Sequence, residues 1–254
     1  MYDSRPPRAD LAAPFEHQGV PEKIACLLLH GFGCSPYTMR TLGDALSERG
    51  HACYAPLLPG HGEALEDFNE VAFTDWIEAA EASFDFFRTR HRRVAVLGFS
   101  MGGALSLHLA TRRDVVALGL LATPVFMGSW VNRIYPVARA VTSALPVVFD
   151  VANRAARMRR RHGVHKVLPV HAVGEFLKLL DSVRPRLGEV TCPLLVAQSR
   201  SDHTVPPPNA PYICHNVASN FRRLIWMRRA FHVLPVDYGC RRLEGELIRF
   251  LAEV

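Results

Sequence analysis

The feature that most constrains this chain is a glycine–serine turn at the end of an apolar segment. Residues 94–97 predict a buried strand and the residues after 100 predict a helix, with Gly98-Phe99-Ser100-Met101-Gly102 between them. In so tight a turn the serine takes a strained backbone conformation, and flanking glycines leave it room. The pattern therefore predicts Ser100 as a nucleophile, with the N–H of Met101 at the start of the helix beside it. An ordinary glycine-rich turn is the alternative.

A nucleophilic serine needs a base, and the base needs an acid that orients it. Asp202 follows an apolar segment at residues 193–199, which predicts a buried strand. His232 follows an alternating segment at residues 221–227, which predicts another strand. Because the carboxyl ends of parallel strands gather at one edge of a sheet, both side chains are expected to meet Ser100 there. The predicted catalytic triad is Ser100, His232 and Asp202.

Other residues compete for the roles of acid and base. Asp237 follows the same strand as His232 and is the rival acid, but a carboxylate so close in sequence to the base is expected to tie down its own loop. The chain has 12 histidines, and His203 directly follows Asp202, which leaves it no separate position as a base. Most of the others lie in predicted helices or caps, where packed or solvated histidines are common: His51, His91, His108, His162, His165, His171 and His215.

A tetrahedral oxyanion needs a second N–H donor besides that of Met101. The apolar segment 25–29 leads into His30-Gly31-Phe32-Gly33, where the chain turns. The N–H of Phe32 is the predicted second donor. His30 is predicted to hydrogen-bond the loop rather than to carry a proton. Cys34 follows the turn and is not expected to act as a nucleophile while Ser100 has its partners.

Five motifs, in this order and spacing, resemble those of the α/β-hydrolase superfamily, and more closely those of small bacterial carboxylesterases and monoacylglycerol lipases. They are His30–Gly33, Leu58–Gly62, Gly98–Gly103, Ser201–Pro206 and the region of His232. The resemblance covers residues 22–254 and implies an α/β-hydrolase fold, a serine hydrolase acting on small-molecule esters, and no metal or organic cofactor. Phe231 departs from the pattern, because the family often has a small residue before the catalytic histidine. The pocket beside the base is therefore expected to differ.

The order of the predicted elements is that of an α/β fold with a mostly parallel sheet of six to seven strands flanked by helices. Strands are expected near residues 24–29, 52–55, 93–98, 115–121, 193–198 and 222–227, with a further short candidate near 14–17. Helices are expected near residues 37–49, 74–90, 101–112 and 240–253, the second of them capped by Thr74. A chain of 254 residues, 49% hydrophobic, can bury one large core, so residues 1–254 are expected to form a single domain.

The alternation of strands and helices breaks off between about residues 125 and 186. Helix-like patterns occur there at residues 130–143, 147–161 and 170–182. This insertion after the strand near 115–121 is expected to form a helical cap over the active site. An elongated, mainly apolar acyl pocket is expected beside Ser100. Its predicted lining residues are Phe126, Trp130, Ile134, Val205 and Phe231.

Charge and cysteine content bear on partners and location. The net charge is +6, and five arginines between residues 154 and 161 have no acidic neighbour. This cluster favours either peripheral contact with anionic lipid surfaces or a solvated face of the cap. The first eight residues lack the apolar core of a signal peptide, no apolar run is long enough to span a membrane, and six cysteines show no framework spacing. These features predict a cytoplasmic protein without stable membrane insertion, and nothing predicts nucleic acid as a partner.

The sequence thus predicts a serine carboxylic-ester hydrolase that acts through an acyl-enzyme on short- to medium-chain acyl esters or monoacylglycerols. A serine at the turn argues against haloalkane dehalogenases, which carry a carboxylate there. Thioesterases, carbon–carbon bond hydrolases and acyltransferases share all the motifs and stay open as alternatives. A non-catalytic binding protein of the same fold is the alternative of another class. Such relatives usually lack a triad residue, whereas this chain has all three candidates.

Overall fold

The computed structural model describes residues 12–146 and 167–254. The expected helix at residues 147–161 and the arginine cluster at 154–161 lie outside these ranges, as do residues 1–8. The side chains of Trp130 and Ile134 are likewise outside what the structure describes. No helix within the described ranges is long and apolar enough to cross a bilayer.

A seven-stranded sheet forms the centre of the molecule, with the strand order β1-β3-β2-β4-β5-β8-β9. The strands are β1 (Phe15–His17), β2 (Ala25–Leu29), β3 (Cys53–Ala55), β4 (Val94–Phe99), β5 (Leu118–Leu121), β8 (Leu194–Ser199) and β9 (Arg222–Met227). Only the pairing of β1 with β3 is antiparallel in this sheet. The expected mostly parallel α/β sheet is therefore confirmed, including the short strand near residues 14–17.

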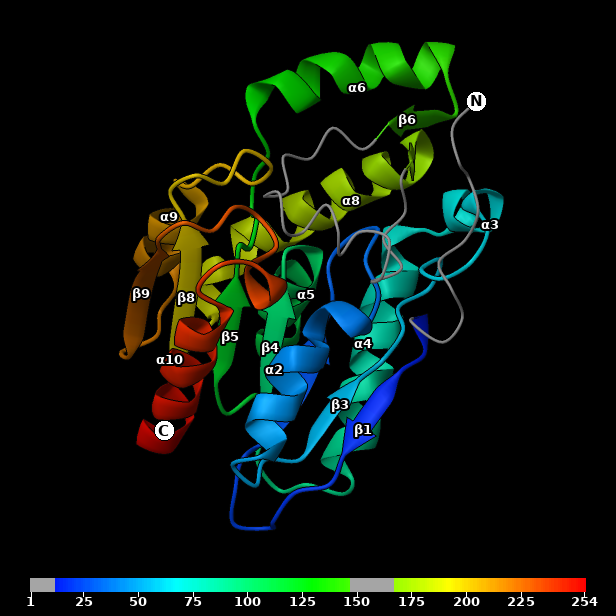
Figure 1. Ribbon diagram of the computed structural model, residues 1–254. Coiled ribbons are helices and arrows are strands. Elements are labelled where there is room, and N and C mark those ends of the chain that lie inside the picture. Colours follow the sequence, from blue (N-terminus) through cyan, green and yellow to red (C-terminus); the bar gives the residue numbers. More distant parts are fainter. Residues whose placement is uncertain (1–11, 147–166) are drawn as a thin grey trace.

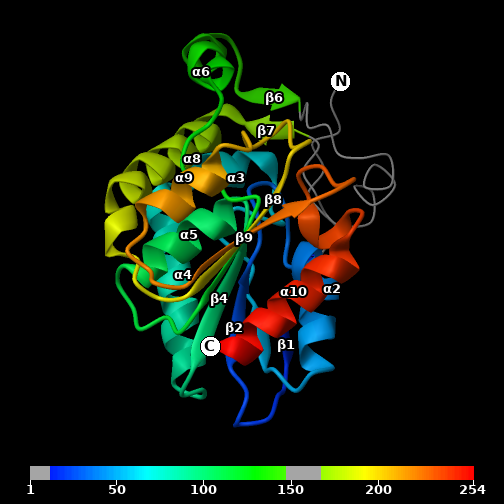
Figure 2. The same cartoon turned by 90° about the vertical axis from the view of Figure 1, so that its left-hand side faces the viewer.

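Helices cover both faces of the sheet (Figure 1). One face carries α4 (Phe73–Arg88), α5 (Met101–Ala110) and α9 (Asn209–Asn216). The other carries α2 (Tyr37–Ser47) and α10 (Cys240–Glu253). Figure 2 shows the two helical layers on either side of the strands. Because both faces are covered, the central strands read as continuous apolar runs rather than as alternating ones.

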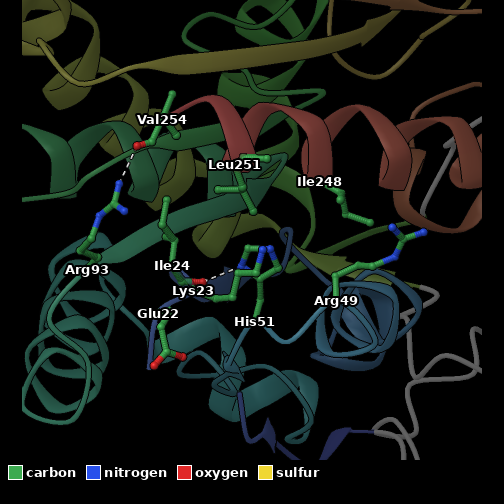
Figure 3. Close-up of a pocket in the computed structure, with 10 residues that line it drawn as sticks. Glu22, Lys23, Ile24, Arg49, His51, Arg93, Ile248, Leu251 and Val254 are labelled. Carbon is green, nitrogen blue, oxygen red and sulfur yellow. Dashed lines mark hydrogen bonds between the residues drawn. The ribbon is translucent and has the colours of Figure 1, made fainter. Parts of the chain in front are cut away.

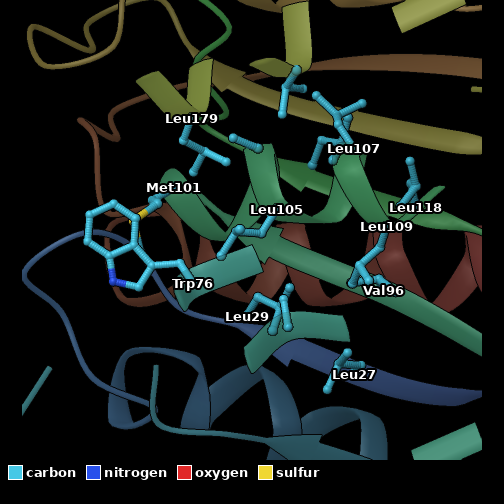
Figure 4. Packing of buried hydrophobic residues seen from close by; sticks show 14 of the residues in the cluster. Leu27, Leu29, Trp76, Val96, Met101, Leu105, Leu107, Leu109, Leu118 and Leu179 are labelled. Atoms are coloured by element: carbon cyan, nitrogen blue, oxygen red, sulfur yellow. The ribbon is translucent and has the colours of Figure 1, made fainter. Parts of the chain in front are cut away.

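The larger part of the core lies between the sheet and the layer of α4 and α5. Leu27, Leu29 and Val96 point from the strands toward this layer, whereas Leu28 and Leu97 belong to the cluster on the α2 and α10 face. Figure 4 shows residues of the first cluster, which extends to side chains at the carboxyl edge of the sheet. Trp76 of α4, Met101 of α5 and Leu179 of α8 (Val170–Val183) are all fully buried there. The side chains beneath the carboxyl edge, where the predicted triad is expected, are thus part of the core.

An insertion between β5 and β8 lies over the carboxyl edge of the sheet. It contains α6 (Ser129–Val141), β6 (Ala144–Pro146), β7 (Val167–Pro169), α8 (Val170–Val183) and the 3₁₀ helix η1 (Arg184–Glu189). Figure 1 places α6 outermost, with α8 between it and the sheet. We call the segment from α6 to α8 the cap. Its helices α6 and α8 were expected, whereas the antiparallel pairing of β6 with β7 was not, because it joins two three-residue segments far apart in sequence.

The start of α4 corrects one expectation. The helix begins at Phe73, with Ala72 at the N-cap position, so Thr74 lies inside the first turn and is not the cap. Asp75 serves the helix end instead, since its Oδ2 accepts a hydrogen bond from the Ala72 N–H at 2.9 Å. Three further short elements had no clear sequence signal: α3 (Leu65–Glu70), α9, and the 3₁₀ helix η2 (Leu234–Val236).

Candidate active site

Ser100 occupies a strained turn between β4 and α5. Its φ of 52° and ψ of −117° lie outside the regions that a non-glycine residue ordinarily adopts. A Cβ at Gly98 would collide with the carbonyl of Gly102 and the hydroxyl of Ser106, and one at Gly102 would collide with the carbonyl of Leu29. The two flanking glycines are therefore required by close backbone approach. The turn directs Ser100 to the carboxyl edge of the sheet, where the residue is 7% exposed.

Three side chains predicted to act together meet at this edge. The Nε2 of His232 lies 3.1 Å from the Oγ of Ser100, and its Nδ1 lies 2.9 Å from the Oδ2 of Asp202. An ionised carboxylate only accepts, so Nδ1 carries the proton and Nε2 is left to accept the serine hydroxyl proton. All three residues are buried, and the ring of Phe99 lies 5.1 Å from that of His232. The arrangement can move a proton from Ser100 to His232.

Asp202 is held by several donors in addition to His232. Its Oδ1 accepts from the backbone N–H groups of Thr204 at 2.9 Å and Val205 at 2.8 Å. Its Oδ2 also accepts from Nε2 of Gln198 at 2.9 Å. Burial alone raises the pKa of Asp202, but the neighbouring His232 and the backbone hydrogen bonds outweigh it and lower that pKa below the ordinary value. The carboxylate is therefore ionised at neutral pH.

Gln198 is a site residue that the sequence reasoning missed. It is fully buried near the end of β8, four residues before Asp202. A polar residue inside an otherwise apolar strand, just before an acidic loop, was the available signal. Its amide orientation follows from Asp202, because only the NH₂ end can donate to a carboxylate.

The loop that carries His232 is fastened on two sides. The Oγ of Ser199 donates to the carbonyl of Ala230, which ties the loop to the end of β8. Asp237 accepts from the N–H of Phe231 through Oδ2 at 2.7 Å and from its neighbour Tyr238 through Oδ1 at 2.6 Å. The rival acid thus ties down its own loop, while the carboxylate next to Nδ1 of His232 is that of Asp202.

The loop after β2 lies directly against Ser100. A Cβ at Gly31 would stand 3.1 Å from the Cβ of Ser100. His30 ties the loop to the segment at Leu58. Its Nδ1 donates to the carbonyl of Gly31 at 3.0 Å, and its Nε2 accepts from the N–H of Leu58 at 3.1 Å. Burial lowers the pKa of His30 to about 4, so it is neutral and structural, as expected. Within the described chain, the N–H groups of Phe32 and Met101 donate to no protein acceptor.

The residues predicted to line an acyl pocket differ in their surroundings. Phe126 and Phe231 are half-buried, and the ring of Phe231 lies 5.9 Å from that of the exposed His203. Val205 is 1% exposed and supports Asp202 through its N–H. Trp130 and Ile134 lie on α6, where their side chains are not described. The elongated pocket stays a prediction.

Three observations outside the triad bear on what the site can do. Burial raises the pKa of Cys34 to about 12, which keeps this thiol protonated and unreactive. Across residues 12–146 and 167–254, no group of three or more His, Cys, Asp or Glu side chains could hold a metal ion. A pocket of about 420 Å³ lies at the opposite, amino edge of the sheet, lined by residues such as Lys23, Arg49 and Arg93 (Figure 3). It contains none of the predicted site residues.

Most of the chain matches a known hydrolase family. Residues 21–238 match the family described as serine aminopeptidase, S33. The chain belongs to this family. The resemblance to the α/β-hydrolase superfamily is thereby confirmed.

Curated relatives and solved structures agree with this family. The chain is 28% identical over 246 residues to a thermostable monoacylglycerol lipase of Bacillus sp. (strain H-257), covering 95% of both chains. It is 24% identical over 245 residues to a carboxylesterase of Bacillus subtilis (strain 168), covering 95% of this chain and 96% of that one. A structure described under LipS and LipT, two metagenome-derived lipolytic enzymes, superposes with a TM-score of 0.86 at 25% identity, over 96% of this chain and 98% of that chain. The expected α/β-hydrolase fold is confirmed by this overlap.

Proposed function

We propose that the protein is a serine carboxylic-ester hydrolase with Ser100, His232 and Asp202 as its catalytic triad. One observation carries the proposal: His232 contacts the Ser100 hydroxyl with one ring nitrogen and the Asp202 carboxylate with the other. An ordinary glycine-rich turn would not need this alignment of three residues from three loops. The similarity to a monoacylglycerol lipase and a carboxylesterase supports an ester as the substrate.

In the proposed acylation step, Ser100 Oγ attacks the ester carbonyl carbon while His232 Nε2 takes the hydroxyl proton. The carbonyl electron pair moves onto oxygen, and the N–H groups of Phe32 and Met101 stabilise the resulting oxyanion. Collapse of the tetrahedral species breaks the bond to the alcohol oxygen, which takes the proton from His232. The ionised Asp202 stabilises the imidazolium that exists between these transfers.

Deacylation uses the same groups with water in place of serine. His232 takes a proton from water as the water oxygen attacks the acyl carbon, and the oxyanion returns to the same two N–H groups. The second collapse breaks the acyl–Ser100 bond, and Ser100 regains its proton from His232. These steps balance without a cofactor.

The substrate class we propose is a short- to medium-chain acyl ester or a monoacylglycerol. Thioesters, amino-terminal peptide bonds and other acyl donors are the alternatives, the second because the family description names an aminopeptidase. We also propose a cytoplasmic location, which the six free cysteines support. Peripheral contact with a lipid surface stays a proposal for the cap.

The proposal is tested with a fluorophosphonate probe and a substrate panel. Ser100→Ala is expected to abolish labelling and to lower turnover by a factor on the order of 10⁶, because it removes the nucleophile. The matched control Ser106→Ala, on the same helix and fully buried, should keep both. The panel compares p-nitrophenyl esters of increasing length, monoacylglycerols, acyl-CoA and aminoacyl p-nitroanilides. Near-normal turnover by Ser100→Ala would overturn the mechanism, and a strong preference for acyl-CoA or for the anilides would overturn the substrate class.

A further inference from the structure

Phe32, whose N–H is the proposed oxyanion donor, inserts its half-buried ring into a cluster of aromatic rings. Three of these rings come from core segments: Phe68 at 5.2 Å between ring centroids, Trp76 at 5.8 Å and His61 at 6.1 Å. The fourth, Phe176, comes from the cap helix α8. It stacks on Phe32 at 5.4 Å with an interplanar angle of 13°, which makes it the nearly parallel neighbour of the ring.

The position of Phe176 is fixed by the residue next to it. Glu175 is 4% exposed, and its Oε2 accepts from the N–H of Phe73 at 3.1 Å, at the first turn of α4. Its Oε1 also lies 2.5 Å from Nζ of Lys178. One turn earlier, the N–H of His171 donates to the side chain of Asn69 at 3.2 Å. These contacts anchor α8 to α3 and α4, so Phe176 meets Phe32 from a fixed support.

The N–H of Phe32 cannot be positioned by a hydrogen bond of its own. It must stay unpaired to serve an incoming oxyanion, and it donates to no acceptor among the described residues. The loop around it turns at Gly33, whose φ is 67°, and closes with a bond from the Cys34 N–H to the Gly31 carbonyl at 3.1 Å. The Gly31 carbonyl belongs to the same planar peptide as the Phe32 N–H and also accepts from Nδ1 of His30 at 3.0 Å, so two hydrogen bonds orient this peptide from its carbonyl side. On the other side of the N–H, the Phe32 residue is held by its ring, so the packing of the ring also bears on where the N–H points.

We infer that Phe176 is a positioning residue for the oxyanion hole: by stacking on Phe32, the cap helix α8 holds the Phe32 N–H in line with that of Met101. The inference rests on the proposed function. It assigns α8 a part in the chemistry of every substrate, including those too short to reach the cap. A residue that only lined an acyl pocket would instead affect long substrates.

The first test is steady-state kinetics on p-nitrophenyl acetate. Phe176→Ala is expected to lower kcat by about tenfold to a hundredfold, since a shift of about 1 Å in a catalytic group has effects of this size, while KM changes by less than about threefold. The affinity for a trifluoromethyl ketone, which forms an oxyanion on Ser100, should fall by the same factor as kcat/KM. Phe176→Leu keeps most of the volume but not the stack and should show a smaller loss in the same direction.

The matched control is Val183→Ala, a buried residue of the same helix that has no ring to stack on Phe32. It perturbs the packing of α8 and should leave kcat within about twofold, as expected for a contact outside the site. Urea unfolding of each variant identifies any that do not fold. If Val183→Ala lowers kcat as much as Phe176→Ala, the effect belongs to α8 packing in general and the inference is overturned.

A double-mutant cycle tests the route through Phe32. In a Phe32→Ala background the N–H remains but the ring is gone, so adding Phe176→Ala should lower kcat no further. An equal further loss in that background would overturn the inference, as would a change confined to the KM of long-chain esters. The two proposals fail separately: activity in Ser100→Ala would refute the proposed function, whereas an inactive Ser100→Ala with a fully active Phe176→Ala would refute only the role of Phe176.

Discussion

Helix α6 and the loops that carry the candidate triad both lie over the carboxyl edge of the sheet, yet the chain holds them in different ways. The loops are fixed by polar groups that pair deep in the molecule, such as Asp202 with two backbone N–H groups and Gln198. The helix α6 has no side-chain cap at Gly128, contains Pro136, and leaves Val137 63% exposed. Among its described side chains, Tyr135 lies against Gly174 of α8, and Ala138 is buried.

Helix α8 is held against the core, as the loops are and α6 is not, although both helices belong to the cap. It buries Glu175 and Phe176 against the core, and Leu179 joins the main apolar cluster. The cap is therefore not one unit: its inner helix is built into the site and its outer helix rests on the inner one. We expect changes in the loops to alter the chemistry for all substrates, and changes in α6 to alter substrate choice with little effect on stability.

The largest expected effect distinguishes the two acids of the loops. Asp202→Asn should lower kcat by about 10⁴-fold, because an amide cannot stabilise the imidazolium and favours the wrong tautomer of His232. Asp237→Asn should lower kcat less than about tenfold, since it weakens only the bonds that hold the loop. Kinetics on one short ester measures both. The reverse order would make Asp237 the acid.

The acid sensitivity of the loop region gives a smaller effect. The pKa of His30 is about 4 when folded and 6.5 when unfolded, so between these values the unfolded chain takes up a proton that folded His30 refuses. The contribution of neutral His30 to the free energy of unfolding is therefore fully present above pH 6.5. It is lost as the pH falls to 4, and the loss amounts to up to about 3 kcal/mol. Burial also lowers the pKa values of His51 and His108, which act in the same direction.

His30→Gln tests this contribution, because glutamine keeps an acceptor for the N–H of Leu58 and does not titrate. The variant should be less stable than the wild type at pH 7 but should lose less stability between pH 6.5 and 4. Urea unfolding across this range measures the difference. Parallel curves for the two proteins would show that His30 is not the group that titrates.

The contact between α6 and α8 is tested by Gly174→Ala. The new Cβ would collide with the hydroxyl of Tyr135 and would stand 2.6 Å from its Cζ, so the ring and α6 must move. We expect kcat/KM for long-chain esters to change by about twofold to tenfold, the range of one altered apolar contact, with acetate hydrolysis unchanged. Gly245→Ala is the matched control in α10, where the added Cβ would stand 4.0 Å from the flexible end of Arg249 and should stabilise the helix by about 0.5–1 kcal/mol. A large loss of acetate hydrolysis in Gly174→Ala would mean that α6, too, is built into the site.

The smallest expected effect is at the surface of α6. Val137→Ala should change the free energy of unfolding by less than about 0.5 kcal/mol, because the side chain is mostly in water. Val125→Ala, at the fully buried start of the insertion, should cost about 2 kcal/mol. Urea unfolding of both variants gives the comparison. Equal losses would show that Val137 is covered in solution.

Much of the fold and the three candidate catalytic residues could be read from short stretches of sequence. Apolar runs of five or six residues specify strands that helices cover on both faces, and a glycine–serine turn between such a run and a helix leaves the backbone few conformations. Asp202 and His232 could be placed because each follows a strand, and parallel strands bring their carboxyl ends to one edge. These signals are local, so they are present in the sequence before the chain folds.

Only the tertiary structure decided how the site is supported. The bond from the Phe73 N–H to Glu175 joins residues 102 positions apart, and the stack of Phe32 on Phe176 joins the first βα loop to the cap. Thr74 had the sequence of a cap, yet α4 begins one residue earlier, where its first N–H meets Glu175 of another element. Contacts of this kind depend on which surfaces meet after the sheet has formed. No local pattern of residues encodes them, because their free energy appears only when both partners are already in place.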